Sequence, residues 1–127
     1  AWGRGLVERL GPAGLTACAA SASLIRWSVT ACAPPLTVLA AVQLLHAATF
    51  AMQHLSAMLV LSRAMPPERA ATAQALHSAL GMGAPGGLLM LLAGVLYARF
   101  GGLVFLAMAG VAGLALLLVR PLARVTG

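Results

Sequence analysis

Residues 36–62 constrain the fold most, because they include no charged residue yet carry several hydrogen-bonding side chains. At 100° per residue, one side of a helix over this stretch collects Gln43, His46, Phe50, Gln53 and His54. In lipid, hydrogen-bonding groups must face protein or a water-filled cavity. The stretch therefore predicts a membrane-spanning helix whose polar stripe is turned inward.

The composition of the whole chain also indicates a membrane protein. The chain has 127 residues, of which 61% are hydrophobic and only 8% are charged, and its mean hydropathy is +0.98. Soluble domains carry roughly 25% charged residues. The net charge of +6 comes from arginines scattered between apolar runs, which form no basic face and argue against a nucleic-acid partner. We therefore expect an integral membrane protein with the lipid bilayer around it.

Four apolar runs are long enough to cross a bilayer, which takes about 20 helical residues. They are residues 13–32, 36–62, 70–98 and 103–119, and residues 1–12 are predicted to form a polar loop. Within the third run, Pro85 lies among glycines, which predicts one helix bent near residues 83–87 instead of two helices and a loop. The predicted fold class is an all-α membrane protein with four transmembrane helices.

The arginines outside the spans predict the orientation in the membrane. With four spans, both chain ends and the turn at 63–69 share one side, which holds Arg4, Arg9, Arg63, Arg69, Arg120 and Arg124. The other side holds Arg99 and the uncharged turn at 33–35. Because arginine accumulates in cytoplasmic loops, we expect both termini in the cytoplasm.

The motifs of common enzymes are missing from the sequence. It contains no P-loop, no paired carboxylates and no cysteine–histidine metal spacing. His46 and His54 are more than about 10 Å apart along a helix, so they cannot share a metal. Cys18 and Cys32 lie about 21 Å apart on one helix, too far for a disulfide. We expect no enzymatic activity, no metal and no cofactor.

Arg26 is the one formal charge inside a span, and two interpretations of it are open. It lies near the end of its helix beside Trp27, so its guanidinium can extend to the membrane interface. Alternatively it points inward and pairs with a carboxylate, on a solute or on another part of the protein.

The polar stripe of residues 36–62 also has two interpretations. Glutamine and histidine can simply form hydrogen bonds between helices. The number of such residues favours a cavity wall, and the third span repeats the pattern with Gln74 and His77. The fourth span has no such residue, so we expect the second and third spans to line a polar cavity and the first and fourth to be peripheral.

The chain resembles the last four helices of a major facilitator superfamily transporter. It is most similar to the phenylpropionate-permease-like branch, which is related to oligosaccharide and nucleoside proton symporters. The residues that carry the resemblance lie at 24–27 (Leu-Ile-Arg-Trp), 43–50 (Gln-Leu-Leu-His-Ala-Ala-Thr-Phe), 54–58 (His-Leu-Ser-Ala-Met), 74–78 (Gln-Ala-Leu-His-Ser) and 93–97 (Ala-Gly-Val-Leu-Tyr).

The resemblance implies a twelve-helix fold in which the second and third spans line the solute cavity. It also implies that Arg26 and His46 belong to a proton-coupling cluster, because sugar symporters keep an arginine and a histidine at this spacing. Those symporters carry a glutamate where this chain has Thr49, so the carboxylate of that cluster is missing at this position. Residues 8–11 are similar to a superfamily loop motif, without its usual basic pair.

The sequence thus predicts the C-terminal part of a secondary transporter in a bacterial cytoplasmic (inner) membrane. We expect a proton symporter for a small organic solute, which needs the missing N-terminal helices of the same transporter as its partner. Candidate cavity or proton-coupling residues are Arg26, Gln43, His46, Thr49, Phe50, Gln53, His54, Gln74 and His77. Two alternatives remain open: a complete four-helix multidrug exporter that works as a dimer, and a non-transporting membrane subunit.

Overall fold

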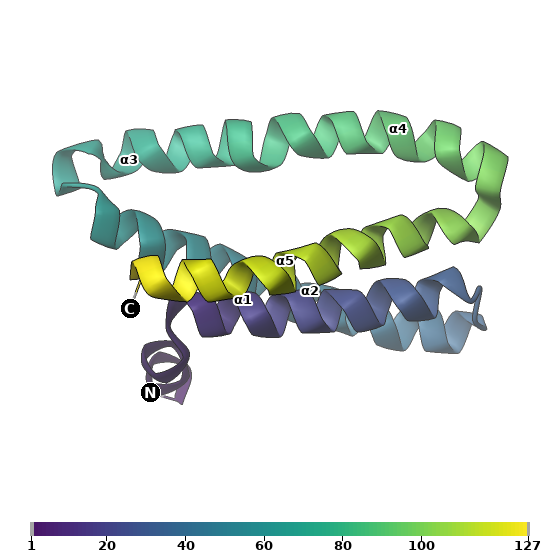
Figure 1. The fold of residues 1–127 in the computed structure, drawn as a ribbon, viewed down its shortest axis with the longest axis horizontal. Coiled ribbons are helices and arrows are strands. Elements are labelled where there is room, and N and C mark those ends of the chain that lie inside the picture. The colour runs from purple at the N-terminus through teal and green to yellow at the C-terminus, as the bar shows by residue number, and fades with distance from the viewer. Residues whose placement is uncertain (1, 127) are drawn as a thin grey trace.

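The computed structural model describes residues 2–126, and these are almost entirely helical (Figure 1). The side chains of residues 2–4, 6, 125 and 126 are not described. They include Arg4, one of the arginines from which the orientation is predicted. The described helices are α1 (Trp2–Ala31), α2 (Leu36–Ala64), α3 (Pro67–Leu76), the π-helix η1 (His77–Gly83), α4 (Ala84–Phe100), the 3₁₀ turn η2 (Gly101–Leu103) and α5 (Val104–Thr126).

The predicted loop at residues 1–12 is wrong over most of its length, because α1 is helical from Trp2 onward. The helix breaks at Gly11, whose φ of 60° and ψ of −177° only glycine adopts without strain. Pro12 follows, and its fixed φ suits the first turn of the helix that begins there. The break turns the short N-terminal stretch away from the rest of α1 (Figure 1).

The third apolar run is one continuous helical stretch, as the sequence predicts, from Pro67 through η1 to Phe100. Its irregular part is η1, where the N–H of Ala84 bonds to the carbonyl of Ala79. This π-helix ends at Gly83, two residues before Pro85, so the irregular segment begins before the bend predicted at residues 83–87. Since a proline ring clashes with the carbonyl four residues earlier in a regular helix, the wider turn relieves the clash without breaking the helix.

The chain reverses direction between α4 and α5 at Gly101. This residue has a φ of 57°, which glycine adopts because it has no Cβ. Figure 1 shows the α2–α3 turn and both chain ends at one end of the molecule, with the α1–α2 and α4–α5 turns at the other. The turns and chain ends are therefore arranged as the predicted orientation requires. Which end of the molecule faces the cytoplasm stays a prediction.

Helix α1 is the packing centre of the described chain, since it lies against both α2 and α5. Its buried residues and those of α5 are mostly small: Leu15, Ala19, Ala20, Val104, Ala109 and Ala112. Small side chains let helix backbones approach closely in membranes. At the far end, Trp27 stacks on Phe105 with ring centroids 5.6 Å apart, and Tyr97 of α4 contacts the same ring at 5.9 Å.

The stretch α3–η1–α4 contacts the other helices mainly near its two ends, and Figure 1 shows it running apart from α1. Most of its large apolar side chains are exposed, including Leu88, Met90 and Leu91. Two helical stretches, Leu36–Ala64 and Pro67–Arg124, are long and apolar enough to cross a membrane, and the second contains the reversal at Gly101. The count of four spans stays a prediction.

A buried hydrogen-bond network joins α2 to the start of α1. The Ser56 hydroxyl, 2% exposed, donates to the Pro12 carbonyl at 2.8 Å. Its oxygen lies 2.8 Å from the Thr16 hydroxyl, which acts as the donor there because serine has a single hydroxyl hydrogen. The network fixes α2 against the break in α1.

We expect Ser56→Ala to lower the free energy of unfolding by about 1 kcal/mol, because interhelical hydrogen bonds in membranes contribute roughly 0.6 kcal/mol each. The measurement is the thermal unfolding midpoint of the detergent-solubilised protein. Ser62→Ala is the matched control, since the Ser62 hydroxyl is exposed and bonds only within its own helix. Equal midpoints for the two variants would show that the network adds no stability.

Candidate functional site

The predicted polar stripe of α2 is exposed in the described chain, and the buried polar side chains of α2 lie beside it. Thr49 and Ser56 are buried against the neighbouring helices, whereas Gln43, His46, Gln53 and His54 are exposed in the described chain. Phe50 lies between two imidazoles, with its ring centroid 6.4 Å from His46 and 6.1 Å from His54. The rings of Phe50 and His54 are nearly parallel, at 5°. One face of α2 thus carries a row of three flat rings.

Arg26 points inward and is only 8% exposed. Its Nη1 donates to Oε1 of Gln43 at 3.5 Å, at the long end of the hydrogen-bond range. Its Cζ lies 4.1 Å from the ring centroid of Trp27, a cation–π contact. The buried Nε atom has no hydrogen-bond partner. The guanidinium therefore retains an unused donor in a buried position.

A cavity of about 370 Å³ lies between α1, α2 and α5, and we call it the Arg26 cavity. Arg26 and Trp27 line it from α1, and α2 supplies His46, Thr49, Phe50 and Gln53. None of its described lining residues is acidic. Small-molecule pockets have volumes of about 300–1,000 Å³ with a few polar groups in an apolar wall, so this cavity matches a small-solute pocket in size and composition.

Thr49 lines the Arg26 cavity but uses its hydroxyl locally. The side chain is 5% exposed, and its Oγ1 donates to the backbone carbonyl of His46 at 2.9 Å. A threonine hydroxyl does not titrate near neutral pH. Among the described residues that line this cavity, His46 carries the one imidazole.

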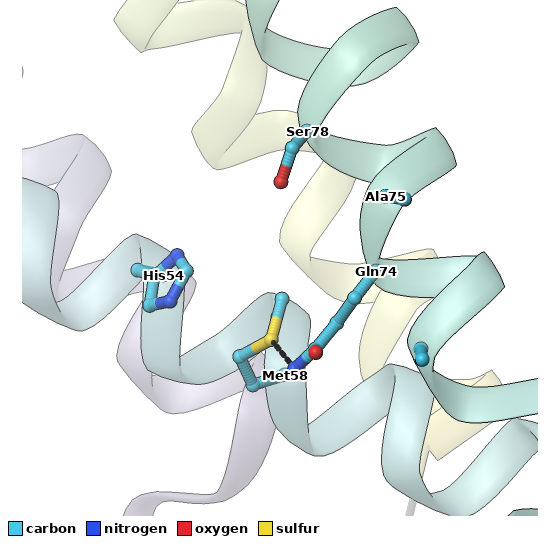
Figure 2. A pocket seen from close by; sticks show the side chains of 6 residues that line it. His54, Met58, Gln74, Ala75 and Ser78 are labelled. Atoms are coloured by element: carbon cyan, nitrogen blue, oxygen red, sulfur yellow. Dashed lines mark hydrogen bonds between the residues drawn. The ribbon is translucent and has the colours of Figure 1, made fainter.

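Two further cavities lie between α2 and the α3–η1 stretch. The first, of about 160 Å³, is lined by Phe50, Gln53, His54, His77, Gly81 and Met82, and we call it the His77 cavity. The second, of about 330 Å³, includes His54, Met58, Gln74 and Ser78. In Figure 2, Gln74 and Ser78 point from this stretch toward α2, and the Gln74 Nε2 donates to the Met58 sulfur at 2.8 Å.

The structure brings the predicted site residues together in three neighbouring cavities. Phe50 and Gln53 line both the Arg26 cavity and the His77 cavity, while His54 lines the two cavities beside η1. Gln43 lies outside these three linings and reaches the site only through its bond to Arg26. Arg26 is buried in the described chain, and its pairing with a carboxylate stays a prediction.

The expectation that the first and fourth spans are peripheral is wrong for the Arg26 cavity. Helix α1 contributes Thr16 and Ser23 to the wall, and α5 contributes Met108. Thr16 and Ser23 are seven residues apart, and Ser23 and Arg26 are three apart, so all three lie on one helix face. This polar face of the first span could have been found from the sequence. The α5 residues are apolar, so nothing in their pattern distinguishes a cavity wall from a lipid-facing surface.

Among the described residues, no group of three or more His, Cys, Asp or Glu side chains is placed to hold a metal ion. Cys18 and Cys32 are both free.

Comparison with known proteins gives one family match. A model described as the MFS_1 like family, where MFS denotes the major facilitator superfamily, matches residues 2–107. No curated protein matches the chain significantly, and no solved structure does.

Proposed function

This chain belongs to the MFS_1 like family, and we propose that it is the C-terminal part of a secondary transporter that carries a small organic anion together with protons. Family membership and the long apolar helices make it an integral membrane protein of transporter type. We propose that it is located in the bacterial cytoplasmic membrane with both termini in the cytoplasm. The solute crosses the membrane chemically unchanged.

The proposal rests mainly on the burial of Arg26 and on the lack of a negatively charged partner for it in the described chain. A buried arginine is costly in a membrane unless a partner compensates its charge. Its partners in the described chain are neutral, one long hydrogen bond and one aromatic ring. The unpartnered Nε and the adjoining cavity support a carboxylate ligand, because guanidinium binds carboxylates through paired donors. A carboxylate from the remaining helices of the same transporter is the other possible source.

His46 is the proposed proton-coupling residue. It lines the same cavity as Arg26, and histidine is the side chain that most often shuttles protons in proteins. A proton on His46 adds a second positive charge beside the solute carboxylate, so proton binding and anion binding favour each other. Thr49 cannot take this role, because its hydroxyl does not titrate near neutral pH.

The rest of the transporter is the proposed partner of the exposed helices. Alternating access requires two halves that rock around a site near the midplane of the membrane. The α3–η1–α4 stretch offers the other helices a long apolar surface, with Leu88, Met90 and Leu91 exposed. We propose that helices of the same transporter cover part of this surface and lipid covers the rest.

The test is uptake by the full-length protein in proteoliposomes with an imposed proton gradient, inside alkaline. Labelled organic anions, sugars and nucleosides are offered separately. We expect the gradient to drive accumulation of an organic anion, and a proton ionophore to abolish it. Accumulation of sugars or nucleosides alone would reject the anion, and no gradient-driven uptake of any solute would reject the symporter.

The proposed orientation predicts where an impermeant thiol reagent reacts. In a background without Cys18 and Cys32, Ala64→Cys should stay unlabelled from outside the cell, because Ala64 ends α2 beside Arg63 at the proposed cytoplasmic side. Pro34→Cys in the opposite turn should label. Strong labelling of the Ala64 variant in intact cells would reverse the assigned orientation.

A further inference from the structure

The imidazole of His77 lies close to Gly81 in the π-helical segment η1. The Nδ1 atom of His77 lies 3.0 Å from the point where a Cβ on Gly81 would stand, and its Cε1 lies at 3.4 Å. The His77 ring therefore lies directly against the backbone of Gly81. Such a contact is tighter than nine in ten real Cβ contacts, so a Cβ at Gly81 requires the ring to shift by a few tenths of an ångström.

The His77 ring borders the His77 cavity opposite the α2 residues. His54 and Phe50 line that cavity from α2, and His77 and Gly81 line it from η1. Phe50 and Gln53 also line the Arg26 cavity, so the two cavities are neighbours that share a wall. Together they offer a cationic group at one end and imidazole nitrogens at the other.

We propose that the solute site extends across Phe50 and Gln53 into the His77 cavity, where His77, positioned by Gly81, recognises a hydrogen-bonding group at the end of the solute distant from Arg26. The solute class is an elongated organic anion with a polar group opposite its carboxylate. Gly81 is a positioning residue, because it acts only through the His77 ring. This inference rests on the proposed transport of an organic anion.

The probes are octanoate and 8-hydroxyoctanoate, which share the carboxylate and differ only in a distal hydroxyl. Binding to the full-length transporter in lipid nanodiscs is measured by calorimetry. Because one hydrogen bond contributes about 1 kcal/mol, the parent should bind the hydroxylated probe about fivefold tighter. His77→Ala should bring this ratio close to one, whereas Gly81→Ala should lower it and His77→Gln should keep part of it.

Gly87→Ala is the matched control for Gly81→Ala, since a Cβ at Gly87 meets nothing within 4 Å. It should leave the binding ratio unchanged. The double variant with His77→Ala and Gly81→Ala should match His77→Ala alone, because both changes remove the same contact. A further loss in the double variant, or a parent-like ratio in His77→Ala, would overturn the proposal.

The anion site at Arg26 and the distal recognition by His77 can be rejected separately. If the parent binds both probes equally, the distal recognition is wrong and the anion site at Arg26 stands. If the parent binds neither probe, the anionic solute is rejected and the inference that rests on it falls as well.

Discussion

Replacing Arg26 with glutamine is expected to reduce the kcat/KM of transport by roughly 10- to 100-fold, because a hydrogen bond to a charged group contributes about 1.5–3 kcal/mol. Glutamine is shorter than arginine, so the change removes the charge that attracts the carboxylate together with the bond to Gln43 and the contact with Trp27. The measurement is initial uptake by proteoliposomes that contain the full-length protein.

Two controls make the Arg26 result specific. Arg99→Gln removes an arginine in the last turn of α4, outside the Arg26 cavity, and should transport like the parent. Arg26→Lys keeps the charge but loses the planar pair of donors, so it should retain part of the rate. Parent-like uptake by Arg26→Gln would mean that this side chain does not bind the solute.

His46→Gln is expected to abolish uphill, proton-driven accumulation and to leave downhill flux of the same solute. Glutamine retains hydrogen bonding at this position of the Arg26 cavity but cannot carry the proton that an imidazole exchanges near neutral pH. The accumulation ratio in an imposed proton gradient is measured beside exchange at equal solute concentrations. Exchange should continue while the ratio falls to one.

His54→Gln is the matched control, because His54 also lies on the α2 stripe but borders the two cavities beside η1 instead of the Arg26 cavity. It should keep uphill accumulation. If His46→Gln accumulates solute like the parent between about pH 5 and pH 8, the coupling role belongs to another group, and His46 only forms hydrogen bonds between helices.

Much of the fold can be predicted from the sequence, because lipid offers no hydrogen-bond partners to the protein backbone. An apolar stretch without charges must be helical in a membrane, which predicts α2 and the continuous run through Pro85. The polar stripe of α2 predicts which of its faces borders cavities, since Gln53 and His54 cannot face lipid at low cost.

Other features depend on tertiary contacts that a residue pattern does not contain. At the N-terminus, α1 kinks at Gly11, whose backbone conformation is not helical, and the helix continues on both sides of the kink. Packing of α1 against α5 rests on alanines, and alanine is equally common on lipid-facing surfaces. The π-helical turn that sets Gly81 against His77 has Pro85 as its sequence signal, but the proline alone does not specify a π-helix.

The central claim, that the solute occupies the Arg26 cavity, is tested most directly by solute protection of a cysteine in its wall. In the background without Cys18 and Cys32, Ser23→Cys places a thiol in the lining, and Ser21→Cys places one on the exposed side of the same helix. We predict that the anion identified by uptake slows alkylation of the Ser23 variant and leaves the Ser21 variant unaffected. Equal alkylation of the Ser23 variant with and without saturating solute would contradict the account.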